Sequence, residues 1–337
     1  MVGGVGWAVL AANAGQFKTL EPVSAGRCAG VTGAAGAEDL TIDRQHSVAL
    51  VSSTDRRALA AGSDVRGAIF AYDLRSRALR DLTAGFSGEF RPHGLSLYRG
   101  REGTRLFVVN HTTAGHSIEI FDWDGLELDH LETVESELLV SPNDVVGVGL
   151  RQFYATNDHA SVGGPSRILE EFLRLRRSTV VFFDGEKVSV AAQDIAYANG
   201  INVSPNGREI FVASTSRGTL HLYTRNVQSG DLHPNTTIEL GTGLDNIEVD
   251  SHGMLWIGAH PKLLSFLAHA GDEESLSPSQ VLWVDPDVGF DPPVRDAFLD
   301  LGEDLSGSSV AAPWGSRLLI GSVFEEHFLD CERDPDA

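Results

Sequence analysis

Six short polar clusters recur along this chain at intervals of about fifty residues, and this period constrains the fold more than any other feature. The clusters are Ala37-Glu38-Asp39, Pro92-His93-Gly94, Pro142-Asn143-Asp144, Ala198-Asn199-Gly200, Leu244-Asp245-Asn246 and Gly307-Ser308-Ser309. A repeat of this length is typical of a propeller blade, which consists of four strands. The sequence therefore predicts an all-β protein, a six-bladed β-propeller.

Short runs of β-branched and aromatic residues between turn signals support this fold class. They occupy residues 47–51, 106–110, 178–183, 209–213, 254–258 and 317–321. Two stretches, 164–177 and 262–278, have apolar residues near helical spacing and are expected to be peripheral helices. Because no low-complexity linker divides the chain, we expect an N-terminal apolar or extended segment over 1–27 and one propeller domain over 28–337.

The only two cysteines, Cys28 and Cys331, lie near opposite ends of the chain. A closed ring brings its first and last segments together, so a disulfide between them would clasp the ring; two unrelated thiols are the alternative. A disulfide would indicate secretion or another oxidising compartment. Residues 6–13 are apolar but too short to span a bilayer, so they are interpreted as a surface helix or as what remains of a trimmed anchor. Lipid association is only weakly indicated.

The formal net charge of −21 argues against nucleic acid as a partner, because binding phosphates requires clustered Lys and Arg. Most of the carboxylates are interpreted as a solvated exterior. Charge and composition leave the oligomeric state open.

The polar clusters predict a metal site. The first residues of the innermost strands of a propeller converge at one end of its channel, where unpaired amides and carboxylates would be costly to desolvate. A hard cation resolves that cost by taking their oxygens as ligands. The oxygen donors are Glu38, Asn143, Asn199, Asp245 and Asn246, which suit Ca²⁺ and disfavour zinc. Asp39 and Asp144 follow ligands directly and would serve a second Ca²⁺ deeper in the channel. Any one such cluster, taken alone, is usually a turn. Only the recurrence of the clusters at one place in the repeat favours a role as metal ligands.

Two histidines form a candidate reactive pair. His93 lies in the second cluster and His111 ends the strand after it, so the two can meet across a hairpin. A histidine beside a metal-bound carbonyl can deprotonate water, and a second histidine can relay the proton. The alternative is a pair of hydrogen-bonded structural histidines.

Seven ordered motifs resemble the paraoxonase/arylesterase family, from about Cys28 to Cys331. They are 37–40 (AEDL), 91–96 (RPHGLS), 108–111 (VVNH), 142–146 (PNDVV), 156–159 (TNDH), 198–204 (ANGINVS) and 244–247 (LDNI). The resemblance implies a six-bladed propeller with two calcium ions, one catalytic and one structural. The catalytic ion would be held by the five oxygen donors above, and the structural ion by Asp39, Asp144 and the backbone carbonyl of Leu95.

The resemblance also implies roles for other residues. His93 and His111 match a histidine dyad, Asp158 matches a proton-shuttling carboxylate, and Cys28 with Cys331 matches the disulfide of the family. The substrate pocket would be lined by Tyr197, His260 and Val323. The long apolar N-terminal helix of lipoprotein-bound members is mostly missing, and the loops at 55–66 and 160–176 differ from the family.

The expected function is calcium-dependent hydrolysis of lactones and, promiscuously, of aryl esters, with water activated by His93 and His111. Acyl-homoserine lactones, and hence quorum quenching, are one candidate substrate class, and longer hydroxy-acid lactones are another. One rival is a phosphotriesterase that acts on organophosphates at the same site. The other rival is a non-catalytic propeller that calcium stabilises for binding.

Overall fold

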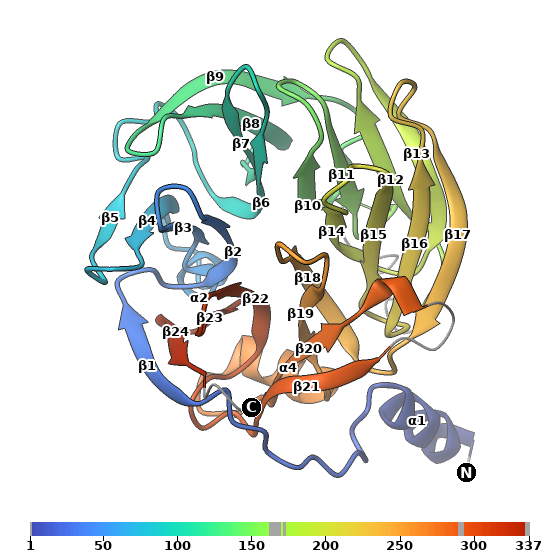
Figure 1. The fold of residues 1–337 in the computed structure, drawn as a ribbon. Coiled ribbons are helices and arrows are strands. Elements are labelled where there is room, and N and C mark those ends of the chain that lie inside the picture. Colours follow the sequence, from blue (N-terminus) through green and yellow to red (C-terminus); the bar gives the residue numbers. More distant parts are fainter. Residues whose placement is uncertain (1, 162–169, 171–172, 289–292, 334–337) are drawn as a thin grey trace.

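Six four-stranded antiparallel sheets surround a central axis in the structure, a computed structural model that describes residues 2–161, 170, 173–288 and 293–333 (Figure 1). The innermost strands are β2 (Ala37–Asp43), β6 (Pro92–Arg99), β10 (Pro142–Gly147), β14 (Ala198–Val203), β18 (Gly243–Val249) and β22 (Ser308–Trp314). Each contacts the next, and β22 returns to β2, so the ring is closed. The predicted six-bladed propeller is confirmed.

The remaining strands of each blade follow in chain order from the axis outward. Blade 1 continues with β3 (Val48–Ser53), β4 (Ala68–Asp73) and β5 (Leu79–Asp81), and blade 2 with β7 (Thr104–His111), β8 (His116–Trp123) and β9 (Leu128–Glu135). Blade 3 adds β11 (Phe153–Asn157), β12 (Ser178–Phe183) and β13 (Val188–Ile195), and blade 4 adds β15 (Glu209–Ser214), β16 (Thr219–Arg225) and β17 (Leu232–Glu239). Blade 5 adds β19 (Leu255–His260), β20 (Ser279–Val284) and β21 (Val294–Asp300). Five of the six predicted strand runs lie in these strands, to within a residue or two at their ends, and the sixth, 317–321, lies in blade 6.

Blade 6 joins the two ends of the chain. Its inner strands are β22, β23 (Arg317–Ser322) and β24 (His327–Glu332), and its outermost strand is β1 (Arg27–Thr32) from the N-terminal side. In Figure 1 the blue β1 lies beside the red strands of the C-terminal end. Cys28 pairs with Cys331 in the β1–β24 register, and a disulfide joins them. The expected clasp is therefore present.

Removing this disulfide through Cys28→Ser together with Cys331→Ser is expected to cost about 2–5 kcal/mol of unfolding free energy, because the bond closes a loop of 303 residues. Thermal unfolding of the oxidised wild type and the double variant measures the effect. Treating the wild type with a reductant should lower its Tm to that of the variant. Equal Tm values for oxidised wild type and variant would show that strand pairing alone holds blade 6 closed.

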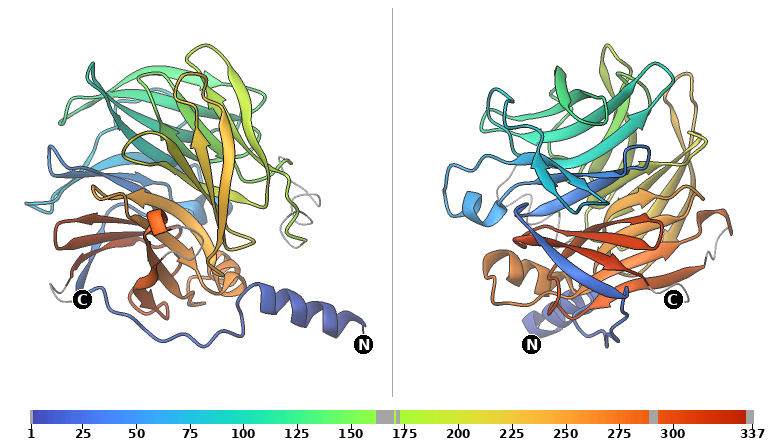
Figure 2. Two further views of the ribbon diagram at one scale, coloured as in Figure 1. Left: turned by 45° about the vertical axis from the view of Figure 1, so that its right-hand side comes forward. Right: turned by 60° about the vertical axis from the view of Figure 1, so that its left-hand side comes forward.

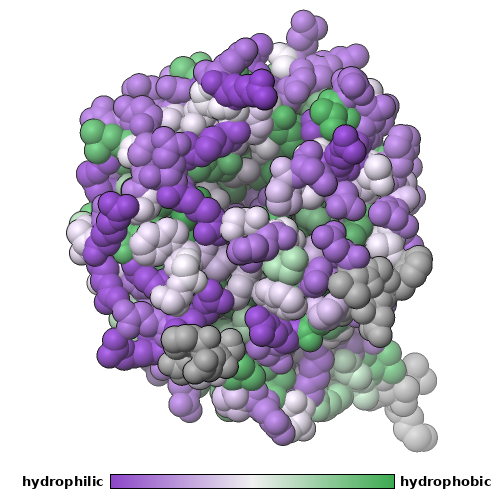
Figure 3. All heavy atoms as spheres, in the orientation of Figure 1, coloured by the Kyte–Doolittle hydropathy of each residue, from purple (hydrophilic) through white to green (hydrophobic). Residues whose placement is uncertain are grey.

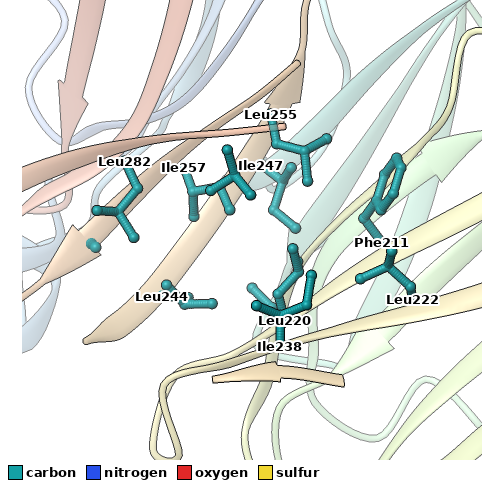
Figure 4. Packing of buried hydrophobic residues seen from close by; sticks show 12 residues of the cluster. Phe211, Leu220, Leu222, Ile238, Leu244, Ile247, Leu255, Ile257 and Leu282 are labelled. Carbon is teal, nitrogen blue, oxygen red and sulfur yellow. The ribbon is translucent and has the colours of Figure 1, made fainter. Parts of the chain in front are cut away.

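Faces of neighbouring blades bury the apolar side chains of the strands. Figure 4 shows one such layer, in which Phe211 and Leu222 of blade 4 pack with Ile247, Leu255 and Ile257 of blade 5. Strands of this kind are covered on both faces, which explains their short and almost continuous apolar runs. The packing sets each inner strand at a defined angle to its neighbours and so positions the polar clusters at one end of the channel.

Helices lie outside the ring. They are α1 (Val2–Asn13), α2 (Arg56–Ala60), α4 (Leu263–Gly271) and the 3₁₀ turn η1 (Pro286–Val288). The helix α4 confirms the prediction over 262–278, although it ends earlier, at a Gly followed by an extended Asp272. Of the predicted helix over 164–177, residues 164–169 and 171–172 lie outside the described residues. Residues 173–177 are not helical, since Arg174 adopts a positive φ of 51° at a turn; that part of the prediction is wrong.

The N-terminal helix α1 projects beyond the blades and is joined to β1 by an extended segment (Figure 2). The side chains of Trp7 and Val9 are more than half exposed. The face in Figure 3 is largely hydrophilic, and apolar residues gather at its lower right, where Figure 1 places α1. Within the described residues, no helix has the length and apolar character needed to cross a membrane.

Candidate metal centre and active site

The polar clusters lie at the starts of the inner strands, as the repeat predicts. Each of the six inner strands starts at or within one residue of its cluster, so Glu38, His93, Asn143, Asn199 and Asp245 occupy equivalent places around the axis. Glycines allow these strand ends to approach each other. A Cβ atom at Gly94 would lie 2.4 Å from Asp144 Oδ1, and one at Gly200 would lie 2.4 Å from the carbonyl oxygen of Asp245. A larger residue at either position would push neighbouring blades apart.

Glu38 is the buried carboxylate at the centre of this group. Its Oε1 accepts a hydrogen bond of 2.8 Å from Asn246 Nδ2 and lies 3.4 Å from His93 Nε2. Its Oε2 lies 3.8 Å from Nη2 of Arg56 on α2. Burial opposes the charged form, but His93, Arg56 and Asn246 outweigh it and lower the pKa of Glu38 to about 2. Glu38 is therefore anionic at neutral pH.

Four buried oxygens of this group have no hydrogen-bond donor among the described residues. They are Glu38 Oε2, Asn143 Oδ1, Asn199 Oδ1 and Asn246 Oδ1. The amide nitrogen of Asn199 donates to Thr215 Oγ1 at 3.0 Å, and that of Asn246 donates to Glu38, so in both residues the oxygen is the atom left over. An unpaired buried acceptor costs about 1–3 kcal/mol. These four oxygens come from the starts of inner strands in four different blades. Such a set fits a hard cation, which takes oxygen ligands.

Asp245, the fifth predicted ligand, is bonded differently. Its Oδ2 lies 2.8 Å from Nε2 of His260, which is the last residue of β19. Burial raises the pKa of Asp245, and the hydrogen bond from His260 opposes that shift. In the described part of the chain, no group of three or more His, Cys, Asp and Glu side chains is arranged to hold a metal ion. The candidate set is instead a mixed one, in which amide oxygens outnumber carboxylates.

Asp39 and Asp144 form a second buried group. Asp39 Oδ2 accepts from the backbone N–H of Leu95, and Asp144 Oδ2 accepts from that of Ile201, each at 2.7 Å. Each carboxylate thus links its own blade to the next. Burial, and then repulsion between the carboxylates, raises the pKa of Asp39, and burial is the largest cause that raises the pKa of Asp144. The predicted ligand role of the Leu95 carbonyl stays a prediction, since the contact shown is made by its N–H.

Glu248, a partly buried carboxylate missed by sequence reasoning, is the third acidic residue of this second group. It lies on β18 two residues after the fifth polar cluster, and Thr41 Oγ1 donates to its Oε2 at 3.2 Å. Burial raises its pKa to about 8. Its charge also acts on Asp39 and Asp144, so three carboxyl groups share this end of the buried channel. Such crowding of negative charge is unfavourable without a cation.

The two predicted histidines meet, and a third joins them. His93 Nδ1 lies 2.9 Å from His111 Nε2, and His111 Nδ1 lies 2.8 Å from Nδ1 of His116. His111 ends β7 and His116 begins β8, and the two are opposite each other in the antiparallel register. His93, His111 and His116 therefore form a row of histidines, which begins beside Glu38 and ends at His116. Sequence reasoning missed His116; the short turn of four residues between two histidines was the available signal.

The other predicted site residues fall around this centre. Asp158 accepts hydrogen bonds from Ser141 Oγ and from His159 Nδ1, and the ring of His159 contacts Tyr197 at 4.9 Å between centroids. The ring of His260 stacks on Phe266 of α4 at 3.8 Å. Phe266 also contacts Phe324, which directly follows Val323. Phe266 thus connects His260 to the residue after Val323, and His159 connects Tyr197 to Asp158.

An apolar cavity of about 130 Å³ opens next to these residues. Leu10 and Ala14 from the α1 end line one side of it, and Leu263 and Phe266 of α4 line another, together with Tyr197. The N–H of Leu263 donates to the carbonyl oxygen of Ala14 at 2.9 Å, which fixes the N-terminal segment against α4. The end of α1 therefore contributes to the surroundings of the candidate site.

A model of the arylesterase family matches residues 45–333. The chain belongs to the arylesterase family. Among its relatives, human serum paraoxonase/arylesterase 1 is 32% identical over 329 residues, which cover 94% of this chain and 91% of the relative. Human serum paraoxonase/lactonase 3 is 35% identical over 279 residues, covering 80% and 77% respectively. The predicted family is therefore confirmed.

Solved structures share the fold of this arylesterase-family chain at lower identity. A putative gluconolactonase superposes with a TM-score of 0.59 at 17% identity and covers 93% of each chain. A calcium-binding protein of Agrobacterium tumefaciens, regucalcin, superposes with a TM-score of 0.56 at 14% identity, over 90% of this chain and 91% of the other. At such identities the likeness concerns the propeller alone.

Proposed function

We propose that this arylesterase-family protein is a calcium-dependent hydrolase that opens lactones and also cleaves aryl esters. The observation that carries the proposal is the set of four buried oxygens without a donor among the described residues, one of which belongs to Glu38, the carboxylate 3.4 Å from His93. Relatives whose names include arylesterase and lactonase support the reaction class. Acyl-homoserine lactones and longer hydroxy-acid lactones are the first substrates to test, the former because their hydrolysis would quench quorum sensing.

The residues present fit two calcium ions with separate roles. Glu38, Asn143, Asn199, Asp245 and Asn246 would hold the catalytic ion, and Asp39, Asp144 and the Leu95 carbonyl would hold the structural one. When bound, the catalytic ion polarises the substrate carbonyl and offsets the negative charge that develops on its oxygen. Arg56 adds a positive charge at 3.8 Å from Glu38, which keeps this carboxylate ionised and available as a ligand.

The histidine row supplies the proton path. The proton path requires the tautomer in which His93 donates through Nδ1 to His111 Nε2, and His111 donates through Nδ1 to His116 Nδ1. In this tautomer Nε2 of His93 is unprotonated, and a bound cation, instead of a proton on His93, would offset the charge of Glu38, whose Oε1 lies 3.4 Å away. Nε2 accepts a proton from water as the water attacks the carbonyl carbon, and the Nδ1 protons move one step along the row toward His116. Asp158 remains a candidate shuttle on the neighbouring blade.

Tyr197, His260 and Val323 are proposed to contact the substrate. The apolar cavity between α1 and α4 adjoins Tyr197 and would accept an acyl or alkyl chain. The disulfide between Cys28 and Cys331 favours secretion or another oxidising compartment.

Turnover on a panel of lactones, aryl esters and phosphotriesters tests the function. With calcium present, we expect kcat/KM to be highest on lactones, lower on aryl esters and lowest on phosphotriesters, because lactones and aryl esters carry the planar carbonyl that the proposed attack of water requires. Highest activity on a phosphotriester would favour the organophosphate alternative instead. Tight calcium binding without turnover on any member would identify a binding propeller.

A further inference from the structure

A second cavity, of about 300 Å³, lies beside the candidate site and has a different chemical character. Its charged lining residues are Lys18, Arg174, Arg217 and Glu239. The whole chain has a formal net charge of −21, so a cavity lined by three cationic side chains and one anionic side chain is unexpected. Clustered positive charge on an acidic protein costs free energy unless an anion accompanies it.

The two arginines form no ion pair with the residues that the structure describes. Neither Arg174 nor Arg217 forms an ion pair in the described part of the chain, although acidic residues outnumber basic ones 47 to 26. Nε of Arg174 is buried and has no hydrogen-bond acceptor among the described residues. Burial and the charge of Arg217 both lower the pKa of Arg174, and Glu239 only partly offsets them. Lys18 differs, because its Nζ donates to the carbonyl oxygen of Gly241 at 2.6 Å.

Two side chains connect this cavity directly to the candidate metal ligands. Thr215 lines the cavity, and its Oγ1 accepts the hydrogen bond from Asn199 Nδ2 at 3.0 Å. His260 also lines the cavity, and its Nε2 contacts Asp245 at 2.8 Å. One side chain therefore separates the cavity from each of two proposed ligands. A substrate whose carbonyl lies at the metal centre could place a substituent in the cavity.

We propose that this cavity is an anion subsite that binds a carboxylate substituent of the substrate through Arg174 and Arg217. The inference rests on the proposed lactone hydrolysis and names the substrate subclass, lactones that carry a carboxylate. Guanidinium groups match the planar, two-oxygen geometry of a carboxylate. Glu239 in the lining reduces the net positive charge and favours a monoanion over a doubly charged phosphate.

A matched pair of substrates tests the subsite: a five-membered lactone with a carboxylate substituent and the same lactone with a carboxamide. The wild type is expected to prefer the carboxylate by about tenfold in kcat/KM, the contribution expected of charge-assisted hydrogen bonds. Arg174→Gln with Arg217→Gln should remove that preference and leave turnover of the carboxamide within about twofold, since the neutral carboxamide has no charge for the two arginines to pair with. Arg101→Gln, which removes an arginine from the distant β6–β7 turn, is the matched control and should retain the preference. The same substrate ratio in wild type and double variant would overturn the proposal.

A binding measurement separates this inference from the proposed function. The probes are cyclopentanone carboxylate and cyclopentanone carboxamide, ketone analogues of the lactones that cannot be hydrolysed. Calorimetric titration of the calcium-loaded protein should show the carboxylate binding about tenfold more tightly, and the double variant should show no difference. This preference without turnover of any lactone would support the subsite and contradict lactone hydrolysis. Turnover with no preference for the carboxylate probe would contradict the subsite alone.

Discussion

Replacing His93 with glutamine is expected to lower kcat for lactone hydrolysis by about 10²- to 10⁴-fold, the usual contribution of a general base. His93 is the member of the histidine row closest to the candidate metal group, with Nε2 3.4 Å from Glu38 and Nδ1 2.9 Å from His111. Glutamine retains the capacity for hydrogen bonding but cannot accept a proton at neutral pH. The loss should therefore appear in kcat, while calcium affinity and Tm remain close to wild type.

Variants of the other two histidines test whether the row acts as a unit. His111→Gln should lower kcat less than His93→Gln, and His116→Gln should lower it least, because each is one step further from the attacking water. The double variant His93→Gln with His111→Gln should lose little more than His93→Gln alone, since residues that act together are not additive. His252→Gln is the matched control, because the side chain of His252 is 83% exposed. Full lactonase activity in His93→Gln would remove His93 from the mechanism and leave the metal proposal standing.

Removing calcium with a chelator is expected to abolish hydrolysis and to lower Tm by about 5 °C or more. The stability change follows from linkage, since a ligand at 100 times its Kd stabilises the folded state by about 2.7 kcal/mol. Without the ion, the unpaired oxygens of Glu38, Asn143, Asn199 and Asn246 remain desolvated, and the carboxyl groups of Asp39 and Asp144 remain crowded. Adding calcium back should restore both activity and Tm.

Asn199→Ala tests the ligand assignment separately from the need for calcium. It removes one unpaired oxygen, and calcium affinity measured by calorimetry should fall at least tenfold, about the loss that even an outer-shell change causes. Asn235→Ala makes the same chemical change at an exposed position of the outer strand β17 and should leave affinity unchanged. Unaltered calcium affinity in Asn199→Ala would exclude Asn199 as a ligand. A chelator that changes neither Tm nor activity would contradict the metal proposal as a whole.

The sequence by itself determined the fold and the composition of the candidate site. Polar clusters at the start of six apolar runs mark the inner strands, because the innermost strand of each blade starts at the channel, where polar side chains from all blades converge. Closure of a ring and hairpin geometry allowed Cys28 to pair with Cys331 and His93 to contact His111, and the family resemblance implied both pairs. The repeat, and the places of these residues within it, can be recognised in a single sequence.

Only the tertiary structure decided which residues reach the site from outside the repeat. Arg56 comes from a short helix, and His116 lies opposite His111 in the register of β7 and β8, which the short turn between them suggests but does not fix. Arg174 and Arg217 are far apart in sequence and come together at one cavity because two different blades and the N-terminal segment meet there. Such contacts depend on how the faces of neighbouring blades pack. This packing results from many weak apolar contacts between residues that are distant in the sequence, so no short motif predicts it.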